Sequence, residues 1–278
     1  MTDIGKHPVD IGGVSETALM TLMVRASEAR RPDGLIDDPM AIHLVDTIDF
    51  DFAKFGFVRR QDMALRALTF DKHARRYLRH HPEATVVALA EGLQTSFFRL
   101  DAPGTDVGHE FTWVTVDLPP MIELRRTLLP ASDRVRTIAQ SALDFSWMDQ
   151  VDTTDGVFIT AEGLLMYLQP EESMALITEC AARFPGGQMM FDLPPSAFAA
   201  LAKRGLRTSL RYRVPSMPFT LSVAEAADLV NTVPGVRAVH DLPLPGGRGR
   251  LMNGVITNLA NSRRLNSLRP TFTLLEFG

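Results

Sequence analysis

The chain has one cysteine among its 278 residues, so no intrachain disulfide can form and a reducing compartment is compatible with it. Cys180 lies among Met174, Ile177, Ala181 and Phe184, which recur at the spacing of one helix face. This setting favours a buried structural thiol over a nucleophile.

Long apolar runs are absent as well. No stretch of 18 apolar residues occurs, and the N-terminus carries Asp3 and Asp10 without the apolar core of a signal peptide. We therefore expect a cytoplasmic protein without a membrane partner.

Basic blocks and metal-ligand spacings are missing too. The net charge is −4, and the arginine pairs are scattered instead of interleaved with aromatics, which argues against nucleic-acid binding. No His-x-x-His or His-Glu-x-x-His pattern occurs, so we expect no metal site.

What the sequence does contain is an alternation of apolar strands and helices, with 45% hydrophobic and 22% charged residues overall. This alternation indicates βαβ units and a mostly parallel, doubly wound α/β sheet. The expected strands are 85–90, 112–117, 135–140, 156–161, 187–192, 236–241 and 271–277, and the expected helices between them are 95–100, 119–129, 145–151, 171–184, 222–232 and 251–259.

Helices are also expected before the first of these strands, at 15–30 with Ser15 as N-cap, at 40–47 and at 61–79, after a loose arm over 1–13. Arg25 and Arg66 lie at the edges of the apolar stripes of their helices. Arg25 is either a snorkelling side chain or a cation that points into a cleft, and Arg66 needs a partner because it flanks a buried face.

Residues 84–99 are expected to form a strand, a turn and the start of a helix. The rest of the chain is arranged around this segment. Gly92 follows a buried apolar strand, and such a turn places backbone N–H groups at the carboxyl edge of the sheet, where open α/β sheets hold nucleotides. The full Gly-x-Gly-x-x-Gly pattern is absent, so an ordinary strand-turn-helix is the alternative.

Asp117 strengthens the nucleotide interpretation. It ends the next strand 25 residues after Gly92, close to the ~20-residue spacing of an acid that holds ribose hydroxyls. The alternative interpretation is that Asp117 is the N-cap of a helix that begins at Pro119.

A set of motifs is spread over nearly the whole chain. They are Val14-Ser15-Glu16-Thr17-Ala18-Leu19, Arg25-Ala26-x-Glu28, Asp37-Asp38-Pro39, Val87-Ala88-Leu89-x-Glu91-Gly92-Leu93, Thr115-Val116-Asp117-Leu118-Pro119, Ala161-Glu162-Gly163-Leu164-Leu165-Met166-Tyr167-Leu168 and Thr273-Leu274-Leu275-x-Phe277-Gly278. In these motifs the chain resembles bacterial class I methyltransferases of the leucine carboxyl methyltransferase superfamily. The nearer branch is that of the polyketide-biosynthesis O-methyltransferases, which includes tetracenomycin carboxyl methyltransferase-like enzymes.

The resemblance implies one methyltransferase domain over 1–278. It would comprise a helical cap over 1–82 and a Rossmann-like core over 83–278, with a lid near 194–220. The sheet would have seven strands, the last of them antiparallel.

The resemblance also implies an S-adenosylmethionine (SAM) site. Arg66 and Arg25 would meet the methionine carboxylate, Glu162 the amino group and Asp117 the ribose hydroxyls. The remaining cofactor-binding positions that the resemblance implies are Ala90, Glu91, Gly92, Leu118, Ser141 and Ala142, the last two by alignment through Trp147.

Two positions depart from the family pattern, because many relatives have glycine at Ala90 and an acid at Gln94. A positive φ at Ala90 would carry strain of ~1 kcal/mol or more.

The segment 194–218 is too long for a simple connection and carries several arginines, so it is either a wall of the site or a solvated basic helix. Tyr167 and Tyr212 are candidates for lining the acceptor site, with core packing as the alternative. Neither is assigned as a catalytic base.

The sequence therefore predicts a SAM-dependent O-methyltransferase that acts on a carboxylate or acidic hydroxyl of a small, polyketide-like molecule. A carboxylate needs no base, which agrees with the lack of histidine in the motif segments. A methyltransferase-fold binding protein without methyl transfer and an NAD(P)-dependent oxidoreductase are the alternatives.

Overall fold

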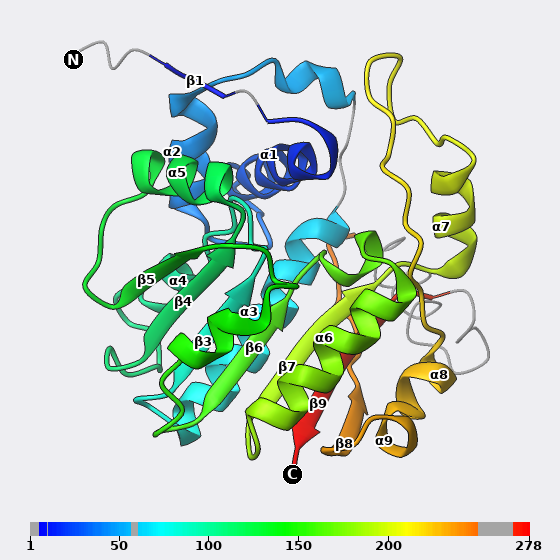
Figure 1. Cartoon of the computed structure of the whole chain (residues 1–278). Coiled ribbons are helices and arrows are strands. Elements are labelled where there is room, and N and C mark those ends of the chain that lie inside the picture. The colour runs from blue at the N-terminus through cyan, green and yellow to red at the C-terminus, as the bar shows by residue number, and fades with distance from the viewer. Residues whose placement is uncertain (1–5, 10, 57–60, 250–268) are drawn as a thin grey trace.

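The computed structural model describes residues 6–9, 11–56, 61–249 and 269–278. Its centre is a seven-stranded sheet in the order β5-β4-β3-β6-β7-β9-β8 (Figure 1). Strands β3 to β7 pair in parallel, whereas β9 is antiparallel to both of its neighbours, which confirms the expected sheet. The strands are β3 (Thr85–Leu89), β4 (Thr112–Asp117), β5 (Val135–Ala139), β6 (Val157–Ala161), β7 (Gln188–Leu193), β8 (Val236–Asp241) and β9 (Thr271–Phe277).

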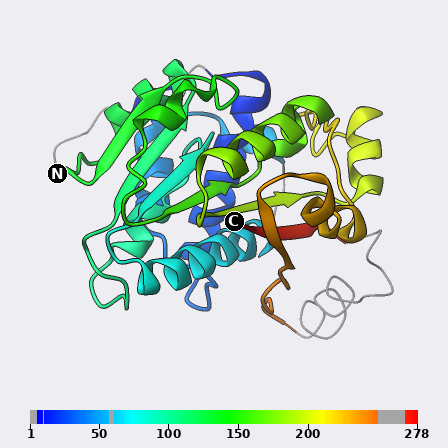
Figure 2. The same ribbon diagram turned by 60° about the horizontal axis from the view of Figure 1, so that its bottom comes forward.

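The central strands β3 and β6 are buried along their whole length and mostly apolar, because helices cover both faces of the sheet. Along β3, Val86 and Ala88 pack with α3 and α4, while Val87 and Leu89 pack in the cluster on the other face with η3 and α6. Figure 2 shows α3 and α6 on opposite sides of the sheet. These helices are α3 (Gln61–His80), α4 (Ser96–Leu100), η3 (Phe145–Gln150) and α6 (Pro170–Arg183).

A group of N-terminal helices packs over the end of the sheet at which β3 and β4 finish. Leu19, Leu22 and Leu44 of this group share an apolar cluster with Leu93 and Leu128. The elements involved are η1 (Gly13–Glu16), α1 (Thr17–Ala29), α2 (Pro39–Thr47), η2 (Phe52–Phe55) and α5 (Pro119–Leu128). The carboxyl edge of the sheet is thereby closed from one side.

The start of the chain differs from the sequence prediction. Ser15 belongs to the 3₁₀ turn η1 instead of capping a helix, and α1 begins at Thr17. The arm is not wholly loose either, because β1 (His7–Pro8) pairs in parallel with β2 (Ile48–Asp49).

The other departures concern helices. The predicted helix 145–151 is the 3₁₀ helix η3, and the predicted helix 222–232 is divided into α8 (Val223–Ala227) and α9 (Leu229–Thr232). Segment 194–218 begins with a helix, α7 (Ser196–Lys203), and the short 3₁₀ helix η4 (Leu165–Tyr167) follows β6. The predicted helix 251–259 lies outside the described residues. None of the helices described is both long and apolar enough to cross a membrane.

A buried ionic cluster joins the N-terminal helices to the turn after β3. Asp38, which is fully buried, accepts hydrogen bonds from Arg99 Nη1 at 2.7 Å, from Arg25 Nε at 3.3 Å and from the Thr95 hydroxyl. Arg99 also forms a two-pronged ion pair with Asp71 of α3, at 2.6 and 3.0 Å. Two arginines and two carboxylates thus neutralise one another inside the protein.

The Asp38 carboxylate also caps α2, because it accepts the Ala41 N–H at 2.9 Å. Burial alone would raise its pKa, but Arg99, Arg25 and the hydrogen-bond donors hold the pKa of Asp38 below its ordinary value. The stabilisation from its charge is therefore present above the unfolded-state pKa of ~3.9 and is lost as the pH falls through the lower folded-state value.

We expect Asp38→Asn to lower the free energy of unfolding by ~3 kcal/mol or more, because it leaves two buried arginines undercompensated while an oxygen remains for the cap. Urea denaturation at pH 7 measures the loss. Asp46→Asn is the matched control, since Asp46 pairs with Arg30 in solvent and should change stability by ~0.5 kcal/mol or less. Equal losses in the two variants would contradict a structural role for the buried cluster.

Candidate functional site

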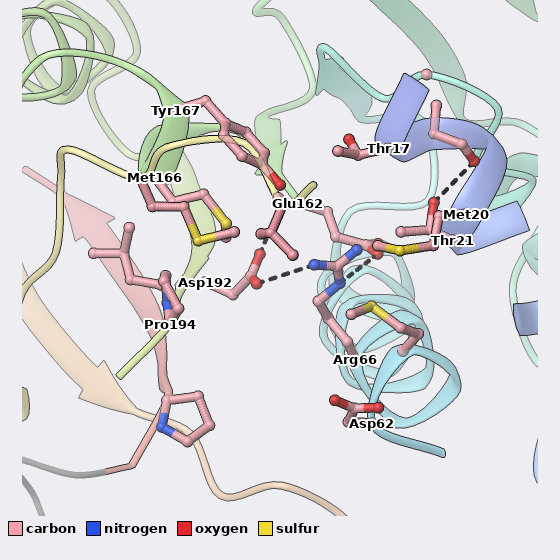
Figure 3. A pocket seen from close by; sticks show the side chains of 18 of the residues that line it. Thr17, Met20, Thr21, Asp62, Arg66, Glu162, Met166, Tyr167, Asp192 and Pro194 are labelled. Atoms are coloured by element: carbon pink, nitrogen blue, oxygen red, sulfur yellow. Dashed lines mark hydrogen bonds and ion pairs between the residues drawn. The ribbon is translucent and has the colours of Figure 1, made fainter. Parts of the chain in front are cut away.

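A cavity of about 420 Å³ opens where the strands end, between the sheet edge and the N-terminal helices. Its wall is built from α1, α3, the turns after β3 and β6, the end of β7 and the segment 208–217. Because parallel strands present their carboxyl ends together, turns far apart in the sequence meet here. Figure 3 shows the labelled side chains around this cavity, with Met166 and Tyr167 on one side and Met20 and Thr21 on the other.

Arg66 of α3 is the cation at the centre of the wall. Its Nε donates to Glu162 Oε1 at 2.9 Å, and its Nη1 lies 3.4 Å from Asp192 Oδ2 (Figure 3). Burial alone would lower the pKa of the Arg66 guanidinium, but the two carboxylates raise it above its ordinary value. The expected partner of Arg66 is thus confirmed, and the group carries a permanent positive charge.

Gln94 holds the second oxygen of Glu162. Its amide nitrogen donates to Glu162 Oε2 at 2.8 Å, and its amide oxygen accepts from both terminal nitrogens of Arg99 at 3.2 Å. The amide is therefore oriented by a cation on one side and a carboxylate on the other. Through Gln94 the buried ionic cluster of the fold fixes the position of Glu162 in the cavity wall.

The turn after β3 has a left-handed backbone conformation at Ala90, where the sequence allowed either sign of φ. Ala90 has φ = 48°, so its methyl group carries the strain expected for a positive φ. Gly92 has φ = 56°, and a Cβ there would lie 2.7 Å from the Ala18 side chain, which only glycine avoids. The turn consequently lies close against the start of α1.

Two further side chains fix this turn. Glu91 accepts hydrogen bonds from Trp113 and Thr115 and pairs with Arg125 at 2.8 Å; burial raises the pKa of Glu91 in spite of Arg125. Arg125 also donates to the carbonyl oxygens of Gly92 and Gln94 at 2.6 and 3.0 Å. Arg125 was not predicted from the sequence, because nothing in the local pattern of α5 marks it.

Asp117 lies at the same edge, beside the turn. Its Oδ2 accepts the Gly92 N–H and its Oδ1 accepts the Leu118 N–H, both at 2.8 Å. Burial raises the pKa of Asp117, and the two backbone donors and Arg125 only partly oppose this. The carboxylate thus joins the ends of β3 and β4.

The cavity takes in only some of the predicted cofactor residues. Arg25, Arg66, Ala90, Glu91, Gly92 and Glu162 line it, whereas Asp117, Leu118, Ser141 and Ala142 lie outside its wall. Arg25 is 2% exposed and donates to Asp38 and to the Leu93 carbonyl oxygen at 2.8 Å, so it is not a snorkelling surface side chain.

The segment 204–217 forms a wall of the cavity instead of a solvated helix. Thr208 donates to the Phe55 carbonyl oxygen at 3.1 Å, and Arg211 pairs with Asp51 at 2.6 Å, so the segment is fastened to η2. Thr208, Tyr212, Val214, Pro215 and Met217 of this segment line the cavity, as does Tyr167 of η4.

Asp192 is the functional candidate that sequence reasoning missed. It lies in β7, accepts the Gly163 N–H at 2.7 Å and contacts Arg66. Burial raises the pKa of Asp192 although Arg66 opposes the shift. An acid in the otherwise apolar stretch Met-Met-Phe-Asp-Leu was the available signal.

The chain has relatives among known proteins and protein families. The model of the family described as leucine carboxyl methyltransferase matches residues 18–181. The tetracenomycin polyketide synthesis O-methyltransferase TcmP of Streptomyces glaucescens is 33% identical over 234 residues, which is 82% of each chain. The chain belongs to the leucine carboxyl methyltransferase family.

Two other comparisons extend the likeness. The SAM-dependent methyltransferase dpfgK of Gibberella zeae is 27% identical over 89% of this chain and 90% of its own. Among solved structures, a methyltransferase from Thermobifida fusca superposes with a TM-score of 0.52 at 13% identity, covering 93% of this chain and 94% of that one. The chain is therefore a SAM-dependent methyltransferase, and SAM is its cofactor.

For this methyltransferase we expect Ala90→Gly to raise the free energy of unfolding by ~1 kcal/mol, because glycine adopts the observed φ without strain. Urea denaturation measures the change. Ala88→Gly, two residues earlier in the buried strand, is the matched control and should lower stability, since glycine weakens a strand interior. A loss of stability in both variants would show that the turn is not strained.

Proposed function

We propose that the protein is an O-methyltransferase whose acceptor is a carboxylate or acidic hydroxyl of a small, polyketide-like molecule. The observation that carries the proposal is the Arg66–Glu162 pair in the cavity wall beside Gly92. An amino acid has one carboxylate and one ammonium group, and this pair offers one partner for each. The donor set therefore fits the amino-acid end of SAM.

In this proposal Arg66 and Arg25 bind the methionine carboxylate and Glu162 accepts from the ammonium group. Gln94 keeps Glu162 oriented by donating a hydrogen bond to one of its carboxylate oxygens. The Glu162 carboxylate retains other lone pairs that can accept from the ammonium group. The backbone of Ala90, Glu91 and Gly92 forms the floor of the cofactor site at the sheet edge. The turn can take this position because Gly92 has no side chain.

The adenosine half is proposed to follow the edge from β3 to β5. Asp117 is fixed by the N–H groups of Gly92 and Leu118 and would accept the ribose hydroxyls with its remaining lone pairs. Leu118 is 47% exposed, which leaves its side chain available to an adenine ring, and Ser141 and Ala142 stand at the end of β5.

When bound, SAM supplies a methyl group that an acceptor oxygen attacks in line, while the sulfur keeps the electrons of the broken bond. The protein's part is to align the two reactants and to exclude water, which the apolar wall contributed by Met166, Met217 and Phe198 supports. A hydroxyl acceptor releases its proton to solvent or to a cavity carboxylate, whereas a carboxylate has none to release.

The acceptor class is also suggested by the relatives. The Streptomyces protein is named for tetracenomycin polyketide synthesis and for O-methylation. Transfer to oxygen and a polyketide-like acceptor are proposed here on that likeness together with the apolar cavity.

We expect SAM and its demethylated product to bind with measurable heat in titration calorimetry. Asp117→Ala and Glu162→Ala should each weaken binding at least tenfold, ~1.4 kcal/mol, because each removes a carboxylate proposed to contact the cofactor. Circular dichroism establishes that the variants remain folded.

Glu171→Ala is the matched control, since Glu171 is an exposed acid in the first turn of α6. The affinity of this variant for SAM should equal that of the unchanged protein. Unchanged affinity in both test variants would contradict the assignment. Binding without methyl transfer to any oxygen acceptor would favour a binding protein over the proposed enzyme.

A further inference from the structure

Asp192 is a buried carboxylate of the cavity wall to which the proposed function assigns no role. It lies near the end of β7 and is 5% exposed. Its Oδ1 accepts the Gly163 N–H at 2.7 Å, and its Oδ2 lies 3.4 Å from Arg66 Nη1 (Figure 3). Because β7 is the neighbour of β6 in the sheet, Asp192 joins the wall beside the residues proposed to hold the amino-acid end of SAM.

The guanidinium of Arg66 is oriented by two carboxylates. Its Nε donates to Glu162, and its Nη1 lies against Asp192. Its Nη2 forms no hydrogen bond with any of the residues that the structure describes. Two of the three guanidinium nitrogens are thus held by the protein, and the third remains for the methionine carboxylate.

The methyl donor and its product differ by one positive charge. The amino-acid end of both is a zwitterion, whose carboxylate and ammonium group match Arg66 and Glu162. SAM has in addition a sulfonium three bonds from the α carbon, so a donor held at Arg66 and Glu162 brings this charge into the same cavity. S-adenosylhomocysteine has a neutral thioether at the same position.

The ion pairs around Arg66 leave an excess of negative charge for the sulfonium. Glu162 and Asp192 both pair with Arg66, and neither forms a second ion pair within the part of the chain that the structure describes. At an effective dielectric constant of ~20, the attraction between unit charges ~10 Å apart corresponds to ~15-fold in affinity. The excess carboxylate therefore favours a cationic ligand over a neutral ligand of the same shape.

The other charged groups near the cavity do not alter this comparison. Remaining acids of the wall, among them Asp62 and Glu91, act on both ligands in the unchanged protein and in a variant of Asp192 alike. Their contributions cancel when the ratio of the two affinities is compared between the two proteins. The change in that ratio therefore reports the charge of Asp192 alone.

We propose that Asp192 determines how strongly the site distinguishes the cationic methyl donor from its neutral product. Its carboxylate stabilises bound SAM and gives no such stabilisation to S-adenosylhomocysteine, which favours release of the product. This inference rests on the placement of SAM under the proposed function. If Asp192 did no more than orient Arg66, its loss would weaken both ligands alike.

Titration calorimetry of the full chain with SAM and with S-adenosylhomocysteine tests the proposal. In Asp192→Asn the affinity for SAM should fall at least fivefold, while that for S-adenosylhomocysteine stays within twofold. The amide removes the charge but keeps an acceptor for the Gly163 N–H. Sinefungin, which carries a protonated amine in place of the sulfonium, should follow SAM. Circular dichroism establishes folding, and Asp192→Ser, which also provides an uncharged acceptor, replaces Asp192→Asn if that variant does not fold.

Asp101→Asn is the matched control. Asp101 pairs with Arg134 at 2.6 Å outside the cavity wall, so its variant removes the same charge elsewhere and should keep both affinities within twofold. Equal losses of affinity for SAM and S-adenosylhomocysteine in Asp192→Asn, or no loss for either, would overturn the proposal. A change of the ratio in Asp101→Asn as large as in Asp192→Asn would overturn it as well.

The proposed function fails by different results. If Glu162→Ala weakens both ligands at least tenfold and Asp192→Asn also weakens both equally, the placement of SAM stands and this inference falls. A changed ratio in Asp192→Asn without methyl transfer from radiolabelled SAM to any oxygen acceptor would remove the proposed function and leave the inference standing.

Discussion

The hydrogen bond from Gln94 to Glu162 is the contact on which the arrangement of the site depends. It joins the turn after β3 to the end of β6, and Arg66 continues the chain of contacts to α3 and to Asp192 in β7. Gln94 itself is fixed by Arg99, which is held by Asp38 and Asp71. A neutral amide is well suited to this place, because an acid would set a second negative charge beside Glu162.

The fold makes this contact available because β3 and β6 are parallel neighbours in the sheet. Their carboxyl ends lie side by side, and the N-terminal helices approach the same edge closely, as the fit of Gly92 against Ala18 requires. The charged groups of the cavity wall are centred on Arg66, and Met166 and Met20 lie on either side of it (Figure 3). These charged groups suit the amino-acid end of SAM.

Much of the fold was predictable from sequence, since short apolar runs bounded by turns locate all seven strands to within one residue. The family resemblance located Arg66, Glu162 and the turn at Gly92, which meet in the cavity wall. Asp192, Arg125 and the orientation of Gln94 were not predictable, because they depend on contacts between residues 29 or more apart in the chain. The start of α1 was misplaced because Ser15 is a good cap by type, yet the chain turns through η1 first.

A crystal structure with bound S-adenosylhomocysteine tests the central claim most directly. The account predicts the amino-acid end of the ligand between Arg66 and Glu162, with the ribose at Asp117 and Gln94 still bonded to Glu162. A ligand bound elsewhere, or a cavity closed by side chains with Glu162 and Asp117 facing away from it, would contradict the account.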